Sequence, residues 1–133
     1  MSRVVVDSSV WIEYLNNRMD FEEVLKLDHM LENEEEILLC PVVYQEILQG
    51  VRDEKLFLKV KSLLGTFQML LPNFPVIEDK AIQLYRSLRK QGITIRKSND
   101  CLIAAYSLVY DAPVLFKDRD FEAICEHSDV RRF

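Results

Sequence analysis

Acidic side chains stand at the ends of two apolar segments, a placement from which carboxylates can bind a metal ion. Asp7 directly follows Val4-Val5-Val6, and Asp118 and Asp120 follow the apolar run 113–116. Such β-branched and apolar runs are typical of buried strands. In open parallel sheets, ligands bind in the crevice at the carboxyl ends of the strands. We therefore expect these three acids to lie at one edge of a sheet.

Two further acids lie on predicted helices. Glu46 comes four residues after Val42 and shares its apolar helical stripe, where an unpaired charge is costly. Asp100 belongs to the helix-start pattern 98–100, which precedes the apolar stretch 101–109. Taken singly, each acid also has an ordinary structural explanation as a helix cap, a turn residue or a salt-bridge partner. Their joint occurrence favours a shared site.

Carboxylates held together in a cleft repel one another, and some would be driven to protonate unless a cation compensates for their charge. Oxygen ligands without His or Cys suit Mg²⁺ or Mn²⁺ rather than zinc. The two histidines, His29 and His127, lie outside the acidic segments. A metal bound by carboxylates can neutralise a phosphodiester and lower the pKa of a bound water. The acids therefore point to metal-dependent hydrolysis of phosphodiesters.

Apolar strands alternate with amphipathic helices along the chain, which predicts an α/β fold. Core strands are expected at 4–6, 37–40 and 113–116, with short edge strands at 69–71 and 130–133. The expected helices cover 10–15 (capped by Ser8 or Ser9), 21–31, 42–49 (stopped by Gly50), 55–64, 78–90, 98–109 and 121–127. This alternation predicts one domain over residues 1–133, with a central parallel sheet flanked by helices on both faces.

The composition suits an ordinary globular domain, with 49% hydrophobic and 29% charged residues in 133. We find no apolar run of membrane-spanning length and no signal peptide, so we expect a cytoplasmic protein. The cysteines Cys40, Cys101 and Cys125 are widely spaced and form no CxxC, which predicts small buried side chains rather than disulfides or a zinc site.

The formal net charge of −5 argues against a nucleic-acid partner, but the charges are unevenly distributed. Acids concentrate in the run 32–36, which is simply explained as a solvated helix end. Basic side chains gather elsewhere, at Arg86, Arg89, Lys90, Arg96 and Lys97, with Lys117 and Arg119 further along the chain. An acidic protein can therefore still carry a local basic surface.

Four segments resemble the successive signatures of PIN-domain ribonucleases, and of the VapC toxins of toxin–antitoxin pairs in particular. They are 4–12 around Asp7, 42–50 around Glu46, 94–105 around Asp100 and 114–121 around Asp118. Because the four occur in order and with family-like spacing, the resemblance covers essentially the whole chain.

The resemblance implies an endoribonuclease that depends on Mg²⁺ or Mn²⁺, cuts tRNA or rRNA, and is silenced by a VapB-type antitoxin. By motif position it assigns the catalytic and metal-binding acids to Asp7, Glu46, Asp100 and Asp118, with Asp120 as a neighbouring metal ligand. It also implies a homodimer. An apolar groove for an antitoxin helix is expected from Trp11, Tyr14, Leu15, Leu48 and Val51, unless these residues belong to the core.

Four polar residues near the acids receive supporting roles. Ser9 and Asn99 are expected to orient Asp7 and Asp100 by hydrogen bonds. Arg96 and Lys97 precede Asp100, where they are equally well explained as contacts to RNA phosphates or as solvated loop charges.

Three other classes of protein are alternatives to this interpretation. A receiver domain needs an adjacent acid pair after its first strand, whereas serines follow Asp7. A haloacid-dehalogenase phosphatase needs Asp-x-Asp, and Ser9 occupies the second position. The remaining alternative is a catalytically inactive PIN-like interaction module, which would leave the repulsion among the acids without compensation.

Overall fold

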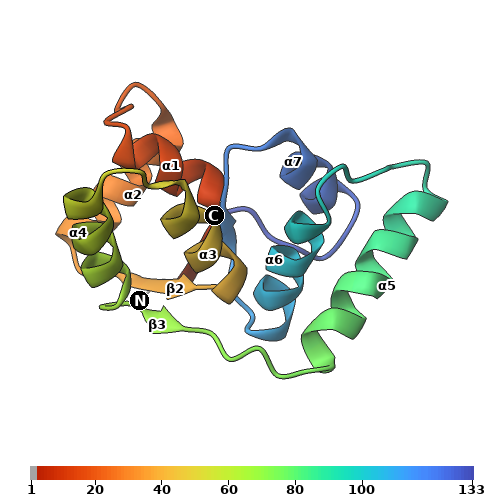
Figure 1. Cartoon of the computed structure of the whole chain (residues 1–133). Helices are drawn as coiled ribbons and strands as arrows, with labels where there is room; N and C mark the ends of the chain where they lie inside the picture. Colours follow the sequence, from red (N-terminus) through yellow and green to blue (C-terminus); the bar gives the residue numbers. More distant parts are fainter. Residues whose placement is uncertain (1–2) are drawn as a thin grey trace.

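The computed structural model describes residues 3–133 and has a parallel sheet at its centre (Figure 1). Within these residues the strands are β1 (Arg3–Val6), β2 (Glu36–Leu39), β3 (Gln68–Met69) and β4 (Val114–Leu115). Their order in the sheet is β3-β2-β1-β4, and every pairing is parallel. Val5 pairs with Leu38 of β2 on one side and with Val114 of β4 on the other. This topology confirms the predicted central strand and α/β class.

The helices are α1 (Ser8–Leu15), α2 (Glu22–Glu32), α3 (Pro41–Gly50), α4 (Glu54–Leu64), α5 (Val76–Lys90), α6 (Ser98–Val109) and α7 (Arg119–Glu126). Helix α1 packs against α2 and α3, and α3 packs against α4. Helix α6 packs against α5, α7 and α3, which joins the two groups. Figure 1 shows α4 and α5 at opposite ends of the molecule.

Burial of the central strand shows why this arrangement forms. Val4, Val5 and Val6 are all fully buried. Successive side chains of a strand point to opposite faces, so both faces of the sheet at β1 must be covered. Helices on both faces provide that cover, as the continuous apolar run predicts.

The ends of several elements differ from the sequence prediction. Helix α1 begins at Ser8, and its cap is Asp7 rather than Ser8 or Ser9, because the Asp7 carboxylate accepts the hydrogen bond from Ser9 N. Gly50 lies inside α3 rather than stopping it, and Val51 caps that helix. The expected strand at 130–133 amounts to one bridge between Val114 and Arg132.

No helix within residues 3–133 combines the length and the hydropathy needed to cross a bilayer. Cys40 and Cys101 are buried, as predicted, whereas Cys125 is half-buried. Trp11 and Leu48 belong to the core, so neither can line an exposed groove as the sequence analysis allowed.

Candidate metal centre

Three aspartates come together at the carboxyl edge of the sheet. Asp100 lies in the first turn of α6, Asp118 caps the N-terminus of α7, and Asp120 follows in the first turn of α7. One carboxylate oxygen from each residue lies within 4.8 Å of the other two. The Asp118 carboxylate also accepts a hydrogen bond from Asp120 N at 2.8 Å, which fixes the two relative to each other.

Asp7 lies buried at the end of β1, where Ser9 holds one of its oxygens. Asp7 Oδ2 accepts hydrogen bonds from Ser9 N, at 3.1 Å, and from Ser9 Oγ. Ser9 Oγ in turn accepts a hydrogen bond from Lys117 N at 3.2 Å. Ser9 therefore orients Asp7, as predicted, and also joins the end of β1 to the residue that precedes Asp118.

Two buried carboxylates each retain an oxygen that no protein donor satisfies. Asp7 Oδ1 and Asp100 Oδ2 are buried and have no hydrogen-bond partner within residues 3–133. Asp7 is 2% exposed and Asp100 is 4% exposed. A buried acceptor without a donor is costly, and a bound cation would remove that cost.

The pKa values of these two acids reflect the same cost of burying a carboxylate without a compensating partner. Burial raises the pKa of Asp100 to about 7, and the charges of Asp7 and Asp118 add to the effect. Burial also raises the pKa of Asp7, with contributions from Glu46 and Asp118, although the hydrogen bonds from Ser9 oppose the shift. The acids therefore interact electrostatically across four segments of the chain.

Glu46 lies at the margin of this group. Its side chain on α3 is half-buried, and its Oε1 accepts a hydrogen bond from Ser8 Oγ at 3.2 Å. Glu46 is not one of the three acids that lie within 4.8 Å of one another, but its charge acts on Asp7. Glu46 is therefore close enough for its charge to act on Asp7, but it lies outside the group of three aspartates.

Arg96 and Lys97 form ion pairs with two of the acids. Lys97 Nζ lies 3.3 Å from Asp118 Oδ2, and the charge of Asp118 raises the pKa of Lys97. Arg96 Nε lies 3.7 Å from Asp120 Oδ1, while Arg96 N donates to Asp120 Oδ2 at 3.2 Å. This pairing differs from both expectations for these residues, which were contacts to RNA phosphates or solvated loop charges. Basic residues at 96–97 and acids at 118–120 carry no sequence signal of their proximity, because 20 or more residues separate them.

Asn99 is exposed on the first turn of α6. Among the residues that the structure describes, no hydrogen bond joins Asn99 to Asp100. Its predicted role in orienting Asp100 therefore finds no contact here, in contrast to the role of Ser9.

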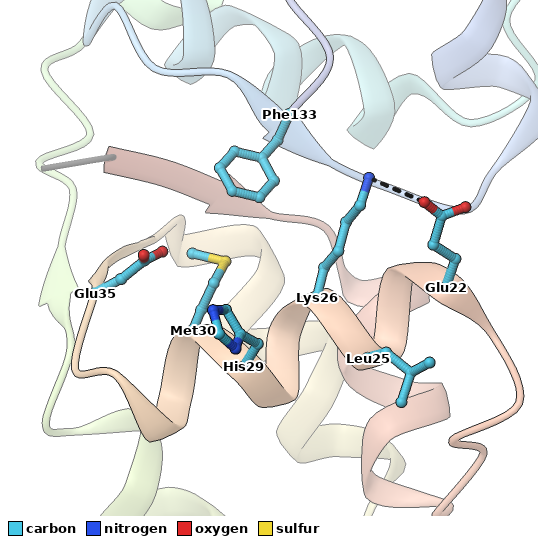
Figure 2. Close-up of a pocket in the computed structure, with 7 residues that line it drawn as sticks. All are labelled: Glu22, Leu25, Lys26, His29, Met30, Glu35 and Phe133. Carbon is cyan, nitrogen blue, oxygen red and sulfur yellow. Dashed lines mark ion pairs between the residues drawn. The ribbon is translucent and has the colours of Figure 1, made fainter.

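A separate hollow of about 360 Å³ lies along α2 beside Phe133 (Figure 2). Figure 2 shows the ion pair between Lys26 and Glu22 at its rim, with nitrogen and oxygen 3.7 Å apart. None of the site acids lines this hollow. The carboxylate group is thus distinct from it.

The fold and the site together define a class: a parallel α/β domain that carries a group of carboxylates, suited to a divalent cation, at the carboxyl ends of its central strands. Comparison with known families makes this more specific. The sequence profile of the PIN domain matches residues 4–127, so the chain belongs to the PIN domain family.

Relatives and solved structures agree with this membership. The chain is 27% identical over 128 residues, 96% of each chain, both to Ribonuclease VapC11 of Mycobacterium tuberculosis and to VapC ribonuclease Mb1587 of Mycobacterium bovis. Its fold is similar to that of a chain in the structure of VapBC2 from Rickettsia felis bound to a promoter DNA fragment, with a TM-score of 0.77. The two chains are 15% identical, and the match covers 98% of this chain and 97% of the other. It is also similar to a chain of VapBC-1 from nontypeable Haemophilus influenzae, with a TM-score of 0.74, 20% identity, and coverage of 98% and 96%.

Proposed function

We propose that this protein is a Mg²⁺- or Mn²⁺-dependent endoribonuclease that acts as the toxin of a type II toxin–antitoxin pair. The observation that carries the proposal is the pair of buried, unsatisfied oxygens, Asp7 Oδ1 and Asp100 Oδ2, beside a group of further acids. Family membership and the names of the curated relatives support the same activity.

The donor set fits the proposed ion. Asp7 and Asp100 would be the principal metal ligands, with Glu46, Asp118 and Asp120 completing the shell directly or through water. When bound, such an ion supplies a water of lowered pKa and neutralises charge on a phosphodiester. The ligands are all carboxylates, which suits Mg²⁺ or Mn²⁺ better than zinc.

The neighbouring residues of the chain would prepare the acids for this role. Ser9 holds the Asp7 carboxylate in one orientation. Its hydroxyl also accepts a hydrogen bond from Lys117 N, which ties the end of β1 to the segment that follows β4. Ser8 likewise holds the Glu46 carboxylate. Lys97 and Arg96 reduce the repulsion around Asp118 and Asp120, and either can turn outward to meet an RNA phosphate because both side chains are largely exposed.

A cleavage assay tests the proposal. Purified protein should cut RNA in Mn²⁺ or Mg²⁺, and chelator should stop the reaction. Asp7→Asn and Asp100→Asn should each abolish cleavage while circular dichroism shows a folded chain. Cleavage that persisted in chelator, or in either variant, would refute the metal mechanism.

The alternative function is an inactive PIN-like interaction module. The ion pairs of Lys97 and Arg96 favour this alternative, because they compensate for the charges of Asp118 and Asp120 without a metal. They leave Asp7 and Asp100 uncompensated, which weighs against it. A chain that cut no RNA and bound no Mn²⁺ in calorimetry would establish the module instead.

The proposed partner is a VapB-type antitoxin, for which the structure offers an apolar groove. A hollow of about 380 Å³ lies between α1, α3 and α4, and its apolar lining is Ile12, Leu15, Ile47, Val51 and Leu56. Ile12 and Leu56 are each 43% exposed. Glu46 lines the same hollow, so a helix bound there would reach the acidic site.

We further propose a homodimer in the cytoplasm, with tRNA or rRNA as substrate. The support is membership of the PIN domain family and similarity to curated relatives named VapC ribonuclease. Sizing by light scattering checks the dimer. Mapping of RNA ends after brief induction in cells identifies the substrate.

A further inference from the structure

Lys117 is fixed beside the acids by its main chain. It follows β4 and directly precedes Asp118. Its backbone N–H donates to Ser9 Oγ at 3.2 Å, and Ser9 holds Asp7. The position of Lys117 is therefore set by the contacts that build the candidate metal centre.

The side chain of Lys117 is held by an aromatic ring. Lys117 Nζ lies 3.8 Å from the centroid of the Phe21 ring, and the Arg18 guanidinium lies 5.0 Å from the same centroid. Phe21 is the cap of α2 and is half-buried. A cation over a phenyl ring loses rotational freedom but keeps its charge and its N–H donors. Lys117 thus presents a positioned ammonium group.

This ammonium group differs from Lys97, Arg96 and Arg18 in its charge balance. Lys97 and Arg96 pair with Asp118 and Asp120, and Arg18 pairs with Glu13 and Asp20. None of the ion pairs formed by residues 3–133 involves Lys117. Its charge is therefore available to an anion from outside the chain.

An acidic chain needs such a charge if it is to hold RNA. The net charge of −5 and the grouped carboxylates repel phosphates, so a strand that reaches the acids needs a cation along its path, and the backbone of Lys117 joins the acidic site at Ser9. We propose that Lys117 binds a backbone phosphate of the RNA strand lying over the acids, and that Phe21 positions Lys117 for that contact. This inference rests on the proposed function, because it takes RNA as the substrate.

Binding to a short fluorescent single-stranded RNA tests the inference without cleavage. The parent carries Asp100→Asn to prevent cleavage, and the added changes are Lys117→Gln and Phe21→Leu. Loss of one charge-assisted phosphate contact should weaken binding about tenfold, and should lower the slope of log K against log salt by roughly 0.7. Phe21→Leu should weaken binding less, since the lysine remains.

Lys61→Gln is the matched control. Lys61 also lies over a phenylalanine, with its Nζ 6.0 Å from the Phe57 centroid, but it belongs to α4 at the far side of Figure 1 from α7. The RNA affinity of the Lys61→Gln variant, and the dependence of that affinity on salt, should equal those of the parent. Unchanged binding by Lys117→Gln, with or without a lower melting temperature, would overturn the inference, as would a parent that binds no RNA.

The cleavage assay separates this inference from the proposed function. If the chain with Asp100 restored cuts RNA but Lys117→Gln binds normally, the phosphate contact is wrong and the nuclease stands. If the chain with Asp100 restored does not cut RNA, but Lys117→Gln lowers the RNA affinity of the Asp100→Asn parent, the proposed nuclease function is wrong and the RNA contact of Lys117 stands.

Discussion

Ser9 and Asp7 form the tightest contact of the candidate metal centre, since both the backbone N–H and the hydroxyl of Ser9 donate to the same oxygen, Asp7 Oδ2. This leaves Asp7 Oδ1 as the buried oxygen that no donor within residues 3–133 satisfies. Ser9 thereby determines which oxygen of Asp7 is available to a ligand. Loss of the Ser9 hydroxyl should therefore lower both the cleavage rate and the free energy of unfolding.

Ser9→Ala should lower cleavage by about 10- to 100-fold, because Asp7 would lose the hydroxyl, one of its two orienting donors. It should also cost about 2 kcal/mol of unfolding free energy, because the hydroxyl makes two hydrogen bonds, to Asp7 and from Lys117 N, each worth about 1 kcal/mol net. Ser8→Ala is the matched neighbour. It removes the bond to the half-buried Glu46, which water can replace, so its effect should be smaller. Initial rates and urea unfolding measure both, and equal rates for the two variants would contradict the assignment.

Asp100→Asn should stabilise the metal-free protein at neutral pH. The pKa of Asp100 is raised from 3.8 to about 7, so the folded chain binds a proton that the unfolded chain releases between those values. The contribution of Asp100 to wild-type stability should therefore be most favourable below about pH 4 and be lost as the pH rises to 7. The amide of Asn carries no charge and avoids that loss, which amounts to at most about 4 kcal/mol.

Thermal unfolding in chelator at pH 4 and pH 7.5 measures this effect. The two proteins should melt alike at pH 4, and the variant should melt higher at pH 7.5. Added Mn²⁺ should raise the melting temperature of the wild type and leave that of the variant nearly unchanged. A variant that melted lower at pH 7.5 would show that the buried charge of Asp100 is already compensated within the protein.

Lys97→Gln should tighten Mn²⁺ binding. The ammonium group of Lys97 lies 3.3 Å from Asp118 and competes with a metal for the same carboxylates. Its side chain is 65% exposed, so solvent screens the pair and the gain should be only about two- to fivefold. Titration calorimetry measures the affinity, with Lys90→Gln at the exposed end of α5 as control. Weaker binding in Lys97→Gln would mean that Lys97 supports the metal ligands rather than competing with the ion.

Leu56→Glu should abolish binding of a co-expressed VapB-type antitoxin, because it places a charge in the apolar groove. The matched control is Leu58→Glu on the same helix, which is 63% exposed and does not line the groove. Co-purification compares the two variants. Retention of the antitoxin by Leu56→Glu would place its docking surface elsewhere.

Hydropathy patterns predicted most of the architecture, because each element has a strong local signal. The continuous Val4-Val5-Val6 run identified a strand covered on both faces, and the apolar stretch after Asp100 identified the buried helix α6. The acids were located as well, since Asp7 and Asp118 follow apolar strands, Asp100 begins an apolar helix, and Glu46 lies on an apolar helical stripe. The assignment of these acids as catalytic and metal-binding residues remains a proposal.

What the sequence could not predict depends on contacts between distant segments. The pairing of Lys97 with Asp118 joins residues 21 positions apart, and the contact of Lys117 with Phe21 joins residues much further apart. Burial of Trp11 depends on packing against Phe67 of a later segment. Local patterns carry no information about such neighbours.

The pairing of β1 with β4 also governs when the site can exist. Val5 and Val114 are neighbours in the sheet although 108 residues lie between them along the chain. Asp7 therefore meets Asp118 only after the ribosome has synthesised the segment that contains both. A nuclease built on this topology would not assemble its site before that point, and a product truncated before Asp118 would lack two of the five acids, Asp118 and Asp120.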